Sequence, residues 1–181
     1  MPVHIEQLGP GFAGSINGLD LRNPLSEKEI IAVHEGMDKY AVLVFKRQTI
    51  TDAEQLQFSQ QLGTIEHAIG TSLREPKDFR LPSTFADVSN LDKDGKPFEI
   101  DDRRRLFAIG NRLWHSDSSF KVVPAKYSIL HAISVPSKGG NTEFAHTPSA
   151  YDELENDIKL EINDYICQHS QMFSRQLVGF T

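Results

Sequence analysis

The sequence lacks long apolar runs, carries a single cysteine and has no excess of basic residues. No run approaches the roughly 18 apolar residues that a membrane-spanning helix needs, and no charged-then-apolar leader begins the chain, so we expect no membrane partner. The lone Cys167 cannot form an internal disulfide, which suits a reducing, cytoplasmic compartment. The net charge of −6 argues against nucleic acid as a partner, and we interpret the one basic cluster, Arg103-Arg104-Arg105, as a solvated loop.

The first third of the chain predicts two helices with a strand between them. Residues 26–29 (Ser-Glu-Lys-Glu) and 51–54 (Thr-Asp-Ala-Glu) each have the spacing of a capping box, and apolar residues follow the first at helical intervals. We expect a helix to begin at each box, the second reaching about residue 62. The unbroken apolar run at residues 41–45 predicts a strand that is buried on both faces.

The second half contains two candidate strands and a late helix. Residues 126–135 read as a strand, and a Gly-Gly pair forms the turn into a second strand at residues 141–145. The Thr-Pro pair at residues 147–148 predicts a helix, with the threonine as its cap and the proline at its first position. We expect this helix to run on through an amphipathic segment at residues 158–165.

A long stretch between these regions has no regular period. From about residue 69 to 111 neither a helical nor a strand pattern holds, apart from a tight turn at residues 93–96 inside a small hairpin. The chain of 181 residues, of which 39% are hydrophobic, is long enough for one domain with a real core. The pattern alone therefore indicates an α+β fold with an irregular insertion.

Residues 114–120, Trp-His-Ser-Asp-Ser-Ser-Phe, are the most informative stretch. On an extended strand His115 and Asp117 project to the same side, where one divalent metal can bind an imidazole nitrogen and a carboxylate oxygen. The pair is two-thirds of the 2-His-1-carboxylate triad that leaves open positions on Fe(II) for oxygen chemistry. By itself, a His-x-Asp triplet also fits a strand histidine that is hydrogen-bonded to a neighbouring carboxylate. The flanking sequence, in which Trp114 has the character of a buried residue, favours the metal.

Several separated motifs share their order and spacing with a known family. They are Gly-Leu-Asp-Leu-Arg at residues 18–22, the apolar run at 41–45, the heptad at 114–120, and Gly-Gly-Asn-Thr-Glu-Phe at 139–144. Together they resemble the taurine dioxygenase / 2,4-dichlorophenoxyacetate dioxygenase family of Fe(II)- and 2-oxoglutarate-dependent oxygenases, above all its aryloxyalkanoate branch. The resemblance covers nearly every residue. It implies a double-stranded β-helix, a jelly-roll-like fold with flanking helices, in which residues 70–110 form a lid-like insertion over the substrate.

The resemblance also implies a site and a reaction. His115 and Asp117 would be the catalytic metal ligands for Fe(II), and the Thr142 hydroxyl would bind the far carboxylate of the co-substrate 2-oxoglutarate. Asn111 and His67 would contact the substrate. The reaction would use O2 to hydroxylate a small, carboxylate-bearing, aryloxyalkanoate-like molecule, with release of succinate and CO2. Residue by residue, the plainer alternatives are a β-branched strand residue for Thr142, a turn residue for Asn111 and an exposed loop histidine for His67.

Part of the family pattern does not occur in these 181 residues. The strands that carry the second metal histidine, and the arginine that binds 2-oxoglutarate, follow the matched part in the family. None of the other histidines has the matching spacing or neighbours: His4, His34, His67, His131, His146 and His169. We expect a single domain over residues 1–181 with an incomplete jelly roll, compatible with a homo-oligomer. The alternatives are a truncated, non-catalytic member that acts as a binding or regulatory protein, a fragment whose partner half lies elsewhere, and a metal-binding β-fold that uses the His-Asp pair differently.

Overall fold

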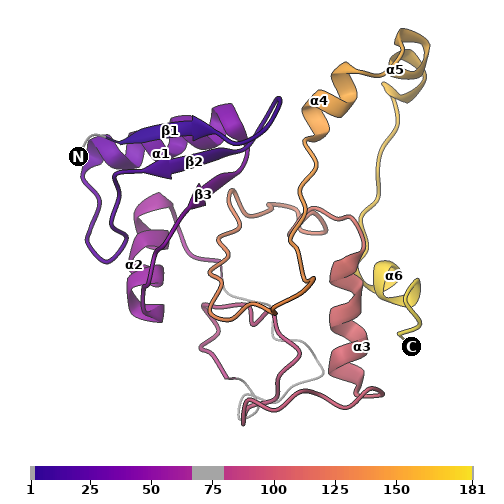
Figure 1. Cartoon of the computed structure of the whole chain (residues 1–181). Coiled ribbons are helices and arrows are strands. Elements are labelled where there is room, and N and C mark those ends of the chain that lie inside the picture. Colours follow the sequence, from indigo (N-terminus) through magenta and orange to yellow (C-terminus); the bar gives the residue numbers. More distant parts are fainter. Residues whose placement is uncertain (1–2, 67–79, 181) are drawn as a thin grey trace. The chain divides into compact units, whose positions relative to one another are not determined.

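The computed structural model describes residues 3–66 and 80–180 (Figure 1). The chain forms two compact units. The first unit combines residues 1–64 with 129–165, and the second combines residues 65–128 with 166–181. Among the described residues, no helix is long and apolar enough to cross a membrane. The strands are β1 (His4–Gln7), β2 (Gly14–Asn17) and β3 (Leu43–Phe45), and the helices are α1 (Glu27–Tyr40), α2 (Asp52–Leu62), α3 (Arg103–Ile109), α4 (Thr147–Asp152), α5 (Asn156–Ile162) and α6 (Gln171–Gln176).

The first unit contains a three-stranded sheet in the order β1-β2-β3. β1 pairs antiparallel with β2, and β2 pairs parallel with β3, so that Ile16 lies opposite both Ile5 and Phe45. α1 packs closely on this sheet at Gly36, where an added Cβ would lie 2.5 Å from the Ile5 side chain and 3.0 Å from that of Leu43. The glycine is therefore required by the close approach of helix and sheet.

Both capping boxes that the sequence predicts are present. Ser26 and Glu29 cap α1, and Thr51 and Glu54 cap α2. The reciprocal hydrogen bonds hold the pKa of each glutamate below its usual range, because they stabilise the charged carboxylate. The first two helices were thus predictable from four-residue patterns.

The strand after α1 is shorter and more exposed than predicted. Ala41 adopts a left-handed conformation with φ of 58° and closes α1 by donating its N–H to the Met37 carbonyl. β3 consequently begins only at Leu43, and Val44 is 37% exposed. The prediction of burial on both faces is wrong, because three strands give this sheet an edge at β3.

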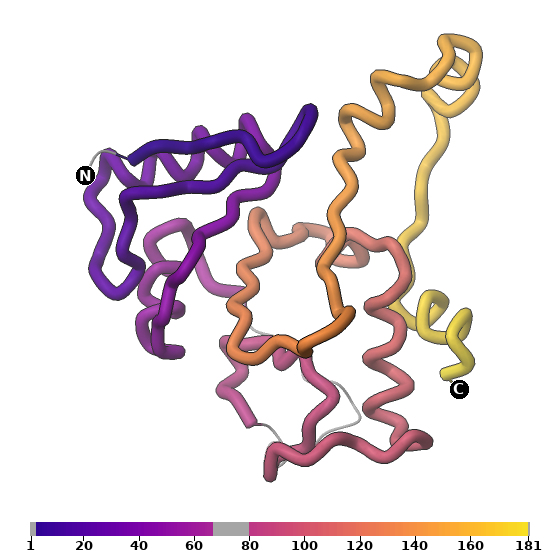
Figure 2. Tube along the Cα trace, viewed as in Figure 1, coloured from indigo at the N-terminus to yellow at the C-terminus, as the bar shows by residue number. Residues whose placement is uncertain are grey.

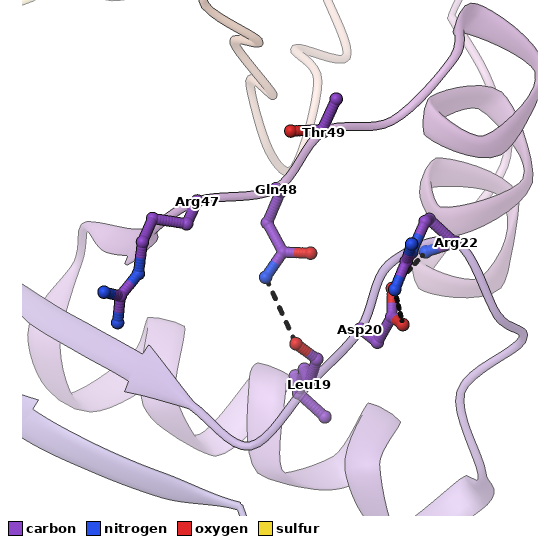
Figure 3. A pocket seen from close by; sticks show the side chains of 6 residues that line it. All are labelled: Leu19, Asp20, Arg22, Arg47, Gln48 and Thr49. Atoms are coloured by element: carbon purple, nitrogen blue, oxygen red, sulfur yellow. Dashed lines mark hydrogen bonds and ion pairs between the residues drawn. The ribbon is translucent and has the colours of Figure 1, made fainter.

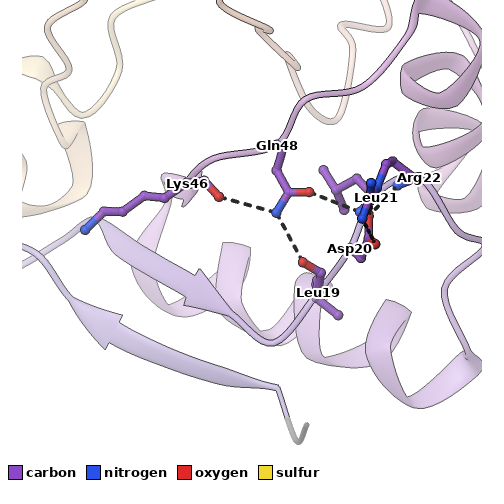
Figure 4. Close-up of polar contacts among 6 residues, drawn as sticks. All are labelled: Leu19, Asp20, Leu21, Arg22, Lys46 and Gln48. Carbon is purple, nitrogen blue, oxygen red and sulfur yellow. Dashed lines mark hydrogen bonds and ion pairs between the residues drawn. The ribbon is translucent and has the colours of Figure 1, made fainter.

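A polar hollow of about 330 Å³ lies beside the end of β3 (Figure 3) and is lined by Leu19, Asp20, Arg22, Arg47, Gln48 and Thr49. The Gln48 side chain accepts from the Leu21 N–H at 3.1 Å and donates to the Leu19 carbonyl at 3.1 Å (Figure 4). Asp20 forms an ion pair with Arg22 at 2.7 Å, and the hydrogen bonds from Arg22 lower the pKa of Asp20 to about 2. These groups tie the 19–22 loop to the sheet, so the hollow is a structural junction.

A second glutamine fixes the chain entry to α1. Gln61 accepts from the Leu25 N–H and donates to the Leu25 carbonyl, both at 3.0 Å. Leu25 belongs to the buried core of this unit, together with Ile16, Leu19, Leu21, Val33 and Phe58.

We expect Gln61→Met to destabilise the protein by about 1–3 kcal/mol, because the half-buried N–H and C=O of Leu25 both lose their partner while the side-chain volume is kept. Chemical denaturation followed by circular dichroism measures the change. Gln60→Met, on the exposed neighbour in α2, is the matched control and should have little effect. Equal effects of the two substitutions would show that the Gln61 contacts contribute nothing to stability.

The second unit contains a helix that the sequence did not predict. α3 begins at Arg103 with Asp102 as its cap, whose carboxylate accepts from the Arg104 N–H at 2.8 Å. Arg104 also forms an ion pair with Asp102 at 2.6 Å. The solvated-loop interpretation of the three arginines is therefore wrong: they form the first turn of a helix. Within α3, Phe107 packs edge-on against the buried Phe180 with ring centroids 5.3 Å apart.

The tight turn at residues 93–96, within the irregular region, was predicted correctly. The Asp92 N–H donates to the Lys96 carbonyl at 2.8 Å, Gly95 has φ of +78°, and Leu91 forms an antiparallel bridge with Pro97. These contacts are the small hairpin expected around residues 93–96.

The strands predicted around His115 and at residues 126–135 and 141–145 do not form in this structure. Figure 2 follows the chain through residues 113–146, where the structure has neither helix nor strand. A strand needs a neighbour for its N–H and C=O groups, and these segments have no ladder partner among the described residues. The late helix is also different: it is two short helices, α4 and α5, and His146 rather than Thr147 occupies the cap position of α4.

Candidate metal-binding site

The segment that carries the His-Asp pair follows a single turn of 3-10 helix. This turn, η2 (Gly110–Arg112), follows α3 directly, and the Leu113 N–H closes it by donating to the Gly110 carbonyl at 3.2 Å. The chain then extends through Trp114, which is 71% exposed. The expectation of a buried tryptophan is wrong.

His115 and Asp117 converge although they do not lie on a strand. His115 Nε2 is 3.2 Å from Asp117 Oδ1, and the two side chains are 46% and 58% exposed. Two ligands that bind one octahedral metal at about 2.1 Å and at right angles to each other are roughly 3 Å apart. The separation of the nitrogen and oxygen atoms therefore fits two adjacent ligands of one metal ion.

The other ring nitrogen of His115 defines the tautomer. Nδ1 lies 2.7 Å from the Leu113 carbonyl oxygen, which can only accept, so Nδ1 carries the proton. In the neutral ring, Nε2 then presents a lone pair toward the Asp117 carboxylate, another acceptor. A cation between the two atoms satisfies both, and a backbone carbonyl on the far nitrogen is a common partner of metal-binding histidines.

The loop after Asp117 is held by contacts from distant residues. Ser118 has a left-handed φ of 56°, and its hydroxyl donates to Glu66 Oε1 at 3.1 Å. Lys121 also pairs with Glu66, and the hydrogen bond from Lys121 is the main reason why the pKa of Glu66 is lowered. The Ser119 hydroxyl lies 2.8 Å from His169 Nδ1. Ser118 and Ser119 thus fix the chain direction immediately after the carboxylate.

No third ligand joins the pair among residues 3–66 and 80–180, since no group of three His, Cys, Asp or Glu side chains in these ranges is arranged to hold a metal. Two of the candidate histidines have other partners. His169 contacts Ser119, and His146 lies 2.7 Å from the Ser149 hydroxyl and stacks on Phe12.

The remaining predicted site residues have different surroundings. Asn111 lies in η2, and its amide oxygen accepts from Arg175 Nη2 at 2.8 Å. Thr142 is exposed in an irregular segment of the first unit, whereas His115 and Asp117 belong to the second, so a shared site stays a prediction. His67 lies outside the described residues. The contacts made by Glu66, His169 and Arg175 were missed, because each joins residues at least 50 positions apart and leaves no periodic signal.

Comparison with known proteins shows the family to which the chain belongs. The family described as "Taurine catabolism dioxygenase TauD, TfdA family" matches residues 4–177. Alpha-ketoglutarate-dependent 2,4-dichlorophenoxyacetate dioxygenases from Burkholderia sp. (strain RASC) and Cupriavidus pinatubonensis are 38% and 36% identical over 181 residues, which is all of this chain and 61% and 63% of theirs. A crystal structure of AAD-2 in complex with Mn(II) and N-oxalylglycine is similar with a TM-score of 0.94 and 52% identity, over 100% of this chain and 63% of that one. The chain thus spans about three fifths of the length of these relatives.

Proposed function

Because this chain belongs to the taurine catabolism dioxygenase TauD, TfdA family, we propose that it carries part of the active site of an Fe(II)- and 2-oxoglutarate-dependent dioxygenase. The observation that carries the proposal is the His115–Asp117 pair. Its 3.2 Å separation and the carbonyl-bound Nδ1 of His115 are what a metal with one imidazole and one carboxylate ligand requires.

Each site residue has a role in this proposal. His115 would bind the metal through Nε2, with its ring orientation held by the Leu113 carbonyl, and Asp117 would supply the anionic oxygen. Thr142 would bind the far carboxylate of 2-oxoglutarate, and Asn111 and His67 would line the substrate pocket. When bound, Fe(II) supplies the oxygen chemistry that couples conversion of 2-oxoglutarate to succinate and CO2 with substrate hydroxylation.

The substrate that we propose is a small carboxylate, aryloxyalkanoate-like in shape. Two of the relatives are named for 2,4-dichlorophenoxyacetate, an aryloxyacetate, and one similar structure contains Mn(II) and N-oxalylglycine. Hydroxylation beside the ether oxygen would give a hemiacetal that collapses to a phenol and glyoxylate.

The fold proposed for the complete site is the double-stranded β-helix. In this proposal residues 1–181 form a single oxygenase domain whose jelly roll is incomplete, and residues 70–110 form a lid-like insertion. The segments predicted as strands at 126–135 and 141–145 would then pair with strands that complete the barrel. The exposed Ile133 and Phe144 side chains in these segments, 75% and 56% accessible, are consistent with such partners.

Succinate formation tests the proposed function. We expect phenoxyacetate-dependent succinate, in the presence of Fe(II) and ascorbate, from a form that includes the continuation of the reading frame, and none from its His115→Ala variant. The 181-residue chain alone should give negligible succinate, because no group of three His, Cys, Asp or Glu side chains among its described residues is arranged to hold a metal. Taurine in place of phenoxyacetate distinguishes a sulfonate from a carboxylate preference. A longer form that folds but forms no succinate would favour the non-catalytic alternative, and His115-dependent succinate from the short chain would reveal a third ligand within it.

A further inference from the structure

Arg175 is a partly buried cation of the second unit that has no carboxylate partner among the described residues. Its guanidinium stacks on Phe107 at 4.7 Å, and Nη2 donates to Asn111 Oδ1 at 2.8 Å. Nη1 lies 3.3 Å from the Ser174 hydroxyl, and Nε is buried without a hydrogen bond. Burial lowers the pKa of Arg175 from its usual value. Burial deprives this guanidinium of part of its hydration, and its contact with Asn111 therefore needs an explanation.

The guanidinium lies directly over the η2 turn. A Cβ added to Gly110 would be 2.2 Å from Arg175 Nη1 and 2.6 Å from its Cζ. Gly110 has a helical φ of −57°, so its backbone conformation does not require glycine, and a side chain there would displace the Arg175 guanidinium. Arg175 therefore contacts this turn through one hydrogen bond and through close packing.

The same turn carries the carbonyl that orients His115. The Leu113 N–H closes η2 on the Gly110 carbonyl, and the Leu113 C=O accepts from His115 Nδ1 at 2.7 Å. A shift of Gly110 or Asn111 is thus transmitted over three residues to the imidazole ring. We propose that Arg175 is a positioning residue: by holding Gly110 and Asn111, it keeps the Leu113 carbonyl in place and His115 Nε2 directed at Asp117. This inference rests on the proposed metal role of His115.

The donors of Arg175 favour this role over the binding of an external anion. A bidentate grip on a carboxylate needs two parallel N–H groups on one edge of the guanidinium. Here Nη2 is bonded to Asn111 and Nη1 faces Ser174, while one face of the group covers Phe107. Both terminal nitrogens therefore contact protein groups, and Nε, the remaining nitrogen, is buried away from solvent.

Copper binding measures the position of His115 directly. Trp114 is the only tryptophan of the chain and precedes His115, so quenching of its fluorescence by Cu(II) reports metal at this site. Cu(II) is the probe because it binds nitrogen and oxygen ligands most tightly among the divalent first-row metals. We expect Arg175→Gln to weaken Cu(II) binding about tenfold, the lower end of the effects seen when the partner that orients a metal-binding histidine is removed.

Arg103→Gln is the matched control. Arg103 stacks on Phe180, in the same aromatic cluster, with Cζ 5.1 Å from the ring centroid. Arg103→Gln removes a guanidinium from the same cluster but leaves Arg175, which contacts Asn111, unchanged. Copper affinity within twofold of the parent is expected for Arg103→Gln, and equal affinities in the two variants would overturn the proposal.

Two further measurements keep the test independent of folding and of the metal. Asn111→Leu removes the acceptor at an exposed position, and it should weaken Cu(II) binding in the same direction; unchanged binding in this variant would also overturn the proposal. In nitrogen-15 NMR of the metal-free chain, we expect His115 of the parent to be mainly the Nδ1–H tautomer and the Arg175→Gln ring to be a mixture. An unchanged tautomer in Arg175→Gln would refute the positioning role of Arg175, whether or not His115 binds metal. Copper binding that does not depend on His115 would refute the proposed function separately.

Discussion

Replacing His115 by alanine is expected to abolish the quenching of Trp114 fluorescence by Cu(II) at metal concentrations that saturate the parent chain. The substitution removes the imidazole whose Nε2 lies 3.2 Å from Asp117 Oδ1 and leaves a single exposed carboxylate. One carboxylate alone binds a transition metal weakly, because the chelate is lost together with the nitrogen ligand. Equilibrium titration should show at least a tenfold loss of affinity, about 1.4 kcal/mol or more.

The control for this experiment is His4→Ala, which removes an exposed histidine from β1 of the first unit. It should leave the Trp114 signal unchanged. Asp117→Asn retains the size of the side chain but removes its charge, and it should weaken binding in the same direction as His115→Ala. Parent-like copper titration of His115→Ala would exclude this residue as a ligand and would remove the basis of the proposed function.

The sequence predicted features that depend on interactions between nearby residues, and it missed those that depend on residues far apart in the chain. The two capping boxes, the tight turn at residues 93–96 and the His115–Asp117 approach each depend on residues within four positions of one another. Local hydrogen bonds and side-chain spacing determine these features, so a short pattern contains the necessary information. The α3 helix is the exception, since Asp102 was a recognisable cap that the run of arginines obscured.

Features that depend on distant partners were not predictable in the same way. Alternation at residues 126–135 indicated an extended chain, but a strand requires a partner that the pattern does not identify. The burial expected for Trp114 likewise depended on what would cover it. The contacts of Asn111 with Arg175 and of Ser118 with Glu66 join residues 64 and 52 positions apart, and neither pair has a sequence signature.

Phe58→Ala is expected to destabilise the first unit by about 3–5 kcal/mol, the usual cost of a large-to-small substitution at a buried aromatic residue. Phe58 is 4% exposed on the inner face of α2, and its ring packs edge-on against Phe45 of β3 with centroids 5.4 Å apart. The substitution removes both the buried ring and this aromatic pair. In close-packed protein interiors the neighbouring side chains relax only partly into such a cavity, so most of this cost remains.

Urea denaturation followed by far-ultraviolet circular dichroism measures this effect, with Leu160→Ala as the matched control. Leu160 lies on α5 of the same unit but is 79% exposed, so its truncation should change stability by less than about 0.5 kcal/mol. Phe58→Leu keeps most of the apolar volume and should fall between the two. If Phe58→Ala were no more destabilising than Leu160→Ala, the cluster around Ile16, Val33 and Phe58 would not be the core that holds α1 and α2 to the sheet, and the stability of this unit would have to arise elsewhere.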